Sequence, residues 1–129
     1  MNVNDLIDVI DNVQTACTKV KGLKNPYGIE MVYFHNKNMH WDKAAEYADK
    51  CNVLGYDDWR LPNTKEIQWI FKHMIERFEC FDGLNYKNRI RVWSNEARSD
   101  EKLAWAVDSK CVKFLYEKNE YKYFAFYVR

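Results

Sequence analysis

The first twenty residues carry apolar side chains at alternating spacings of three and four. These positions are Val3, Leu6, Ile10, Val13, Cys17 and Val20. The rhythm is typical of an amphipathic helix, and Gly22 followed by Pro26 would end it. We therefore predict a helix over residues 3–20 within an N-terminal unit of residues 1–24. That helix either docks on its own domain or joins copies of the chain into a small homo-oligomer.

The pattern then changes to a short alternating segment followed by a second helical one. Residues 29–35 alternate in the manner of a half-buried strand, and residues 36–39 are typical of a turn. From Trp41 to Leu54 apolar residues return at every third or fourth position. This spacing predicts a second helix, which Gly55 would end.

Residues 55–66 join this helix to the next one. Pro62 fixes its own φ and disfavours the α region for the residue before it. The backbone must therefore be extended before Pro62 and can become helical after it. A cap from Asn63 or Thr64 would start a third helix that runs to Arg77.

The same segment places an arginine between two apolar side chains. Trp59 and Leu61 point to one side of an extended chain, and Arg60 points to the other. An arginine in this setting usually bonds a carboxylate or carbonyl, because its planar fork donates in two directions at once. We expect Arg60 to bond Glu66 or a buried carbonyl, which is a structural role.

The second half of the chain has strand patterns. Strand-like runs occupy residues 91–94, 103–107, 112–115 and 123–128. The polar residues 95–102 should form an exposed loop, and a hairpin about residues 118–120 would pair the last two strands. One strand, two helices and then several strands predict an α+β domain, which we place at residues 25–129.

Composition narrows the function classes. The chain of 129 residues is 47% hydrophobic and 16% aromatic, so it folds, and its rings build either a core or a recognition surface. A net charge of +1 gives no field that would attract nucleic acid. No apolar run can span a bilayer and none resembles a signal peptide. We expect a cytoplasmic chain with no membrane insertion and no nucleic-acid partner.

The cysteine, histidine and acidic residues do not have the spacing that is typical of a metal site. The four cysteines are Cys17, Cys51, Cys80 and Cys111. Their wide spacing favours buried thiols over bridges or a zinc site, and His35 with His40 is weak evidence for a metal. A calcium site needs clustered oxygen ligands, which the side chains of five residues could offer: Asn95, Glu96, Asp100, Glu101 and Asp108. Arg98 and Lys102 lie among them, which favours a solvated loop, so we expect no metal and no cofactor.

Five motifs occur in order between residues 28 and 129. Trp41, Ala44 and Tyr47 form W-x-x-A-x-x-Y, and Asp58-Trp59-Arg60-Leu61-Pro62 with Glu66 forms DWRLP-x-x-x-E. They are followed by Val92-Trp93-Ser94-Asn95, Ala104-Trp105-Ala106-Val107 and the closing Tyr127-Val128-Arg129. Together they resemble the DUF1566 family, also called the Lcl C-terminal domain.

That resemblance implies a C-type-lectin-like fold. Two helices would pack on a twisted antiparallel sheet, and the second half of the chain would present a recognition surface. The tryptophans of the motifs, Trp59, Trp93 and Trp105, would be buried in the core. Tyr127 stands where many members have cysteine, so a bridge from there to a cysteine such as Cys51 is lost. Surface relatives imply that an oligomer built on the N-terminal helix would be a trimer.

The candidate ligand-binding residues lie in that second half. Five polar side chains, of both charge signs, could form hydrogen bonds with a ligand: Asn95, Glu96, Arg98, Asp100 and Lys102. Aromatic rings for stacking would come from Tyr116, Tyr121 and Tyr123. Aromatic faces with polar donors suit a sugar or a protein epitope. We predict a non-enzymatic module that recognises a glycan or a protein surface. The alternative that these tyrosines only complete the sheet stays open.

Two other functions remain. The same scaffold could serve a small intracellular or phage-encoded protein that binds and blocks a macromolecular partner. Formylglycine-generating enzymes, similar at fold level, hold copper with a close cysteine pair near the C-terminal end. Here Cys111 has only Cys80 in the same half, and all three histidines lie in the first 73 residues, far from Ser94 and Ser99. An enzyme is therefore the third choice.

Overall fold

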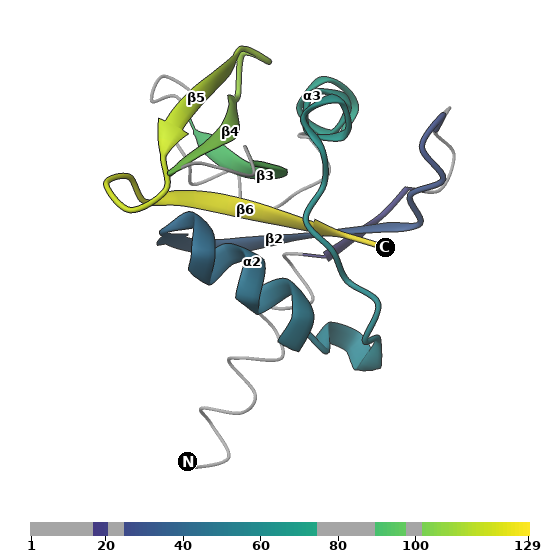
Figure 1. Cartoon of the computed structure of the whole chain (residues 1–129). Coiled ribbons are helices and arrows are strands. Elements are labelled where there is room, and N and C mark those ends of the chain that lie inside the picture. The colour runs from purple at the N-terminus through teal and green to yellow at the C-terminus, as the bar shows by residue number, and fades with distance from the viewer. Residues whose placement is uncertain (1–16, 21–24, 75–89, 98–101) are drawn as a thin grey trace.

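The computed structural model describes residues 17–20, 25–74, 90–97 and 102–129. Within them, six strands form one sheet in the order β1-β2-β6-β3-β4-β5 (Figure 1). The strands are β1 Cys17–Lys19, β2 Met31–Met39, β3 Arg91–Ala97, β4 Leu103–Asp108, β5 Lys113–Glu117 and β6 Tyr123–Val128. The helices are α2 Trp41–Lys50 and α3 Thr64–His73, with a 3-10 turn at Val53–Gly55.

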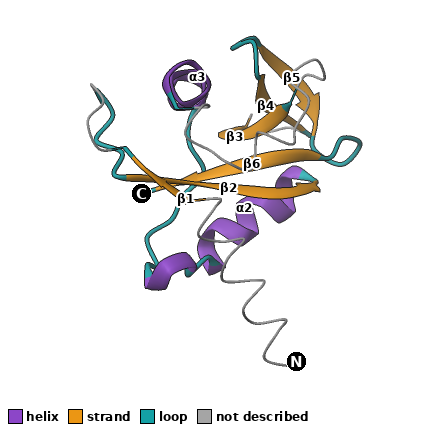
Figure 2. Ribbon diagram, turned by 180° about the vertical axis from the view of Figure 1, so that it is seen from behind, coloured by secondary structure: helices purple, strands orange, loops and turns teal. Residues whose placement is uncertain are grey.

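The two helices cover opposite faces of the central strands β2 and β6 (Figures 1 and 2). Alternation along the strands divides the core accordingly. Val32, Phe34 and Phe126 pack with the α3 side chains, and Tyr33 and Tyr127 pack with those of α2. The sheet is therefore buried on both faces at its centre.

The α+β class is confirmed, but the prediction of a wholly antiparallel sheet is wrong. β3 and β6 run parallel, with Val92 opposite Phe124, while every other neighbouring pair is antiparallel. The long connection between them allows this, because parallel neighbours need a crossover. The sheet is mixed and open, with β1 and β5 at its edges.

The last residues of the predicted N-terminal helix form a strand. Cys17–Lys19 pairs with β2, where Cys17 lies opposite Tyr33, and the backbone N–H of Val20 donates to the carbonyl of Glu30 at 3.0 Å. Pairing with an open strand edge overrides the local helical pattern here. Residues 1–16 lie outside the described residues, so the remaining helix, the division after residue 24 and the oligomer stay predictions.

Several predicted boundaries are wrong because pairing extends or redirects them. The expected turn at 36–39 is strand, since a shift in register after His35 lets Met39 still pair with Tyr123. The expected loop at 95–102 does not begin at Asn95, because β3 runs to Ala97 and includes Asn95 and Glu96. Residues 98–101 of that loop lie outside the described residues.

The expected hairpin of the last two strands does not form. β5 pairs with β4, and β6 lies between β2 and β3. The helix predicted to reach Leu54 ends at Lys50, and the indole N–H of Trp59 donates to the carbonyl of Val53 in the turn that follows.

The bend around Pro62 is formed as predicted. Trp59 and Leu61 are buried, whereas the side chain of Arg60 is half exposed. The Arg60 backbone exchanges hydrogen bonds of 2.9 and 2.8 Å with Val128 in β6. This bridge fixes the bend against the end of the central strand β6.

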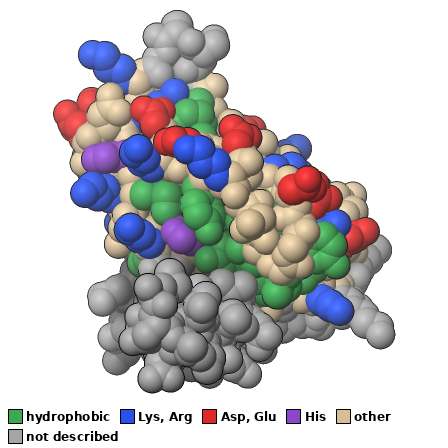
Figure 3. All heavy atoms as spheres, turned by 90° about the horizontal axis from the view of Figure 1, so that it is seen from below, with side chains coloured by type: hydrophobic (Ala, Val, Ile, Leu, Met, Phe, Trp, Pro, Cys, Tyr) green, Lys and Arg blue, Asp and Glu red, His purple; other side chains and the backbone are tan. Residues whose placement is uncertain are grey.

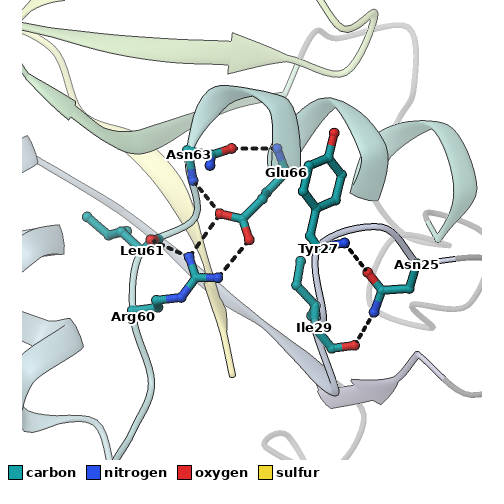
Figure 4. Close-up of polar contacts among 7 residues, drawn as sticks. All are labelled: Asn25, Tyr27, Ile29, Arg60, Leu61, Asn63 and Glu66. Atoms are coloured by element: carbon teal, nitrogen blue, oxygen red, sulfur yellow. Dashed lines mark hydrogen bonds and ion pairs between the residues drawn. The ribbon is translucent and has the colours of Figure 1, made fainter.

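Arg60 also fixes the start of α3 (Figure 4). Its Nη1 and Nη2 donate to the two carboxylate oxygens of Glu66 at 2.9 and 2.7 Å. Glu66 in turn accepts from the backbone N–H of Asn63, whose side chain accepts from the Glu66 N–H. This reciprocal capping box confirms the predicted cap at Asn63, and the two hydrogen bonds confirm the predicted bond of Arg60 to Glu66.

Candidate ligand-binding surface

Three tyrosines predicted from the sequence as ligand-binding lie together. The ring of Tyr116 is 5.1 Å from that of Tyr121 and 4.9 Å from that of Tyr123, centroid to centroid. The rings of Tyr121 and Tyr123 are nearly parallel, 5.8 Å apart with an interplanar angle of 16°. With Trp41, described below, they form what we call the aromatic surface.

The rings meet although their strands are not neighbours. Tyr116 lies in β5 and Tyr123 begins β6, and the connection between them carries Tyr121 across the gap. The buried ring of Trp93 supports Tyr123 from beneath at 5.0 Å. Tyr121 keeps 42% of its surface exposed, while Tyr116 and Tyr123 are half buried. A ligand can therefore reach ring faces that the core holds in place.

Trp41 and Lys118 extend this surface to the start of α2. The ammonium of Lys118 lies 4.3 Å from the centre of the Trp41 ring, within range of a cation–π interaction. The Trp41 indole N–H donates to the carbonyl of Ser94 at 2.8 Å, which fixes the ring. Nδ1 of His40 lies 3.1 Å from the carbonyl oxygen of Tyr121. No pattern in the sequence pointed to this role of Lys118, since it is far from Trp41 along the chain.

A pocket of about 330 Å³ opens on the other side of Trp41. We call it the Trp41 pocket. Its apolar wall comes from Trp41, Trp59, Leu61 and two alanines of α2, and its polar groups come from Asp49, Arg60 and Asn95. Aromatic walls with a few polar groups are typical of small-ligand sites, so the pocket continues the aromatic surface.

The predicted polar residues do not act as one group. Asn95 is exposed and lines the Trp41 pocket. Glu96 is used elsewhere, because its carboxylate accepts from the backbone N–H of Thr64 at 2.9 Å and so caps α3. Lys102 is exposed, and its carbonyl accepts from the N–H of Lys118. Arg98 and Asp100 lie outside the described residues.

The motif tryptophans have different environments. Trp59 and Trp93 are buried, as predicted. The prediction that Trp105 is buried is wrong: it is partly exposed, with the ammonium of Lys113 5.1 Å from its ring centre. Trp105 projects to the opposite side of β4 from the buried Ala104 and Ala106, which explains the difference.

The hydroxyl of Tyr123 stays protonated at neutral pH. Burial, and then the neighbouring Tyr116, raise the pKa of Tyr123 to about 12. A protonated phenol both donates and accepts hydrogen bonds. Tyr123 can therefore pair with hydroxyl or amide groups of a ligand without adding charge.

Candidate groups for catalysis or metal binding have structural partners. Ser94 is buried, and its hydroxyl donates to the carbonyl of Trp105 at 2.8 Å. One carboxylate oxygen of Asp108 accepts from the N–H groups of Lys110 and Val112. Within the described residues, no three His, Cys, Asp or Glu side chains gather as metal ligands would, and no described helix is long and apolar enough to cross a membrane.

The comparison with protein families is consistent with the motifs. The family model of the Lcl C-terminal domain matches residues 11–129. The chain therefore belongs to the Lcl C-terminal domain family, also called DUF1566. No curated protein and no solved structure matches it.

Proposed function

We propose that this chain is a non-enzymatic recognition module that binds a glycan or a protein surface through the aromatic surface. The observation that carries the proposal is the convergence of Tyr116, Tyr121 and Tyr123 beside Trp41 and Lys118. Tyrosine and tryptophan faces are rigid and amphipathic, so they bind sugar rings or side chains at low entropic cost. The adjoining Trp41 pocket would orient the ligand with Asn95.

We also propose that the fold is C-type-lectin-like. Family membership, the α+β class and the placement of the three tyrosines in the second half of the chain support this assignment. The tyrosine rings lie where the connection from β5 to β6 meets the start of α2. A rigid scaffold that positions aromatic side chains in this way suits the recognition of a ligand.

A printed glycan array probed with the wild-type chain and with Tyr121→Ala tests the proposal. Tyr121 is the most exposed of the three rings, so its removal should not unfold the chain. We expect binding to at least one glycan class, weakened about tenfold in Tyr121→Ala, the loss typical of a central aromatic contact. Calorimetry on the strongest hit would measure that factor.

Tyr27→Ala is the matched control. Tyr27 is 37% exposed and contacts Trp69 of α3, so it lies away from the aromatic surface. It should bind as the wild type does. Equal binding by wild type, Tyr121→Ala and Tyr116→Ala would contradict the proposal.

The partner-blocking function gives a different result in the same experiment. A flat array, together with a stoichiometric protein complex that Tyr121→Ala abolishes, would assign the aromatic surface to a protein partner. The exposed rings and Lys118 are compatible with such an interface, since interface centres are enriched in tyrosine and tryptophan.

A further inference from the structure

A second pocket, of about 560 Å³, lies on the opposite flank of α2. The helix presents Trp41, Ala45 and Asp49 to the Trp41 pocket, and Lys43 and Tyr47 to this one. Each set is spaced by about one helical turn, so the two sets line different sides of the helix. Figure 3, seen from below, shows lysine and arginine side chains, with acidic ones among them, next to hydrophobic side chains on this side of the molecule.

The base of this pocket is largely apolar and is formed by His35, Tyr47 and Met39. The rings of His35 and Tyr47 lie 4.5 Å apart, tilted by 31°, and Met39 continues the surface along β2. Nδ1 of His35 is 3.0 Å from the hydroxyl of Tyr33, which holds the imidazole in place. The base is thus built from rings that the core has already positioned.

The rim carries an excess of positive charge. It is formed by Lys37, Lys43 and Lys50 with a single acid, Glu46. The carboxylate of Glu46 lies 2.7 Å from the ammonium of Lys50 and 3.5 Å from that of Lys43. The hydrogen bond from Lys50, and then the charge of Lys43, lower the pKa of Glu46, so it is ionised at neutral pH. One carboxylate offsets one of three ammonium groups.

We propose that this lysine pocket binds a small anion that carries an aromatic body. Its volume lies within the range of about 300–1,000 Å³ that is typical of small-molecule sites. The aromatic body would contact His35, Met39 and Tyr47, and the anionic group would contact the lysines of the rim. A simple ion would use only the rim and a neutral ring only the base, so a molecule with both parts binds best. The site is separate from the aromatic surface and does not depend on its function.

His35 provides a specific signal of binding. Burial, and then the charge of Lys37, lower the pKa of His35 below 6.5. An anion held by the rim would offset the field of Lys37, so the pKa of His35 should rise when the pocket is filled. Lys37, Lys43, Lys50 and Glu46 are the charged groups that line the pocket with it, from β2 and α2.

The experiment is an NMR titration of the full chain with phenyl phosphate, inorganic phosphate and benzyl alcohol. Phenyl phosphate should shift the signals of Met39 and Tyr47 and raise the pKa of His35. Its affinity should exceed that of either other probe by about tenfold, since each of those lacks one half of the contacts. Inorganic phosphate that binds as tightly as phenyl phosphate would overturn the proposal, as would benzyl alcohol that does so.

Variants of the rim complete the test. Removing two exposed lysine contacts in Lys37→Gln/Lys50→Gln should weaken phenyl phosphate by about fivefold to tenfold. Lys65→Gln is the matched control, since Lys65 is exposed on α3, across the sheet. Equal affinity in all three proteins, or no shift of His35, Met39 and Tyr47 with phenyl phosphate, would overturn the site. A backbone amide spectrum checks that each variant is folded.

Discussion

The guanidinium of Arg129 donates to both carboxylate oxygens of Asp58, from Nε at 2.7 Å and from Nη2 at 3.2 Å. The Tyr56 ring covers the same guanidinium, with its centre 3.7 Å from Cζ. Arg129, which follows β6, is therefore bonded to Asp58 at the start of the segment 58–66. The ion pair of Arg60 with Glu66 lies at the other end of that segment. In the pair of Arg129 with Asp58 the carboxylate is exposed, whereas in the pair of Arg60 with Glu66 the carboxylate is buried.

These two ion pairs should differ in their effect on stability. Glu66→Gln places an amide nitrogen against the donors of Arg60 and leaves a buried group poorly paired. We expect it to lower the free energy of unfolding by about 1–3 kcal/mol. Asp58→Asn is the control, and its smaller effect should shrink further at high salt. Urea unfolding at low and high salt measures both, and an equal loss in the two variants would contradict the assignment.

The contribution of Glu66 should also disappear in acid. Burial alone would raise the pKa of Glu66, but the hydrogen bonds from Arg60 and from the Asn63 backbone outweigh it and lower that pKa below 4.5. The unfolded chain then takes up this proton first, so the stabilisation is complete above pH 4.5 and is lost as pH falls through the lower folded value. The stability gap between wild type and Glu66→Gln should narrow there. A gap that stays constant with pH would rule this out.

Tyr127 should stabilise the core mainly through its ring. It is fully buried, stacks 6.2 Å from Tyr33, and donates its hydroxyl to the carbonyl of Ala44 at 2.8 Å. Tyr127→Phe loses only that hydrogen bond, which costs about 1 kcal/mol. Tyr127→Ala leaves a cavity and should cost about 3–5 kcal/mol. Chemical denaturation of both variants tests this order, and a larger loss in Tyr127→Phe would reverse the interpretation.

The described thiols should react slowly in the native state. Burial, and then the nearby Cys51, raise the pKa of Cys17 to about 12. Burial likewise raises the pKa of Cys51 and of Cys111. At about pH 8 a thiol of pKa 12 is ionised to roughly one part in ten thousand, so labelling by a disulfide reagent needs unfolding.

Cys80 lies outside the described residues, so the labelling is done in Cys80→Ser. Its three thiols should be protected in buffer and react quickly in denaturant. A thiol that reacts fast in the native protein would contradict the burial argument.

The sequence by itself determined the features that depend on near neighbours. Pro62, Asn63 and Glu66 lie within five residues, so the extended arrival, the capping box and the bond to Arg60 follow from local geometry. The strand at Tyr123–Val128 was also predictable, because its β-type residues are continuous. Family membership followed from the order of the motifs, because that order is read directly from the sequence.

The tertiary structure decided which distant segments meet. Strand pairing turned the end of the predicted N-terminal helix into β1 and gave β5 and β6 different partners, because a strand's hydrogen bonds go to whichever edge the fold presents. The contact of Lys118 with Trp41 and the lysine pocket beside α2 arise in the same way. Local pattern specifies an element and its buried face, but only the packing of the whole chain specifies what lies across from its exposed face.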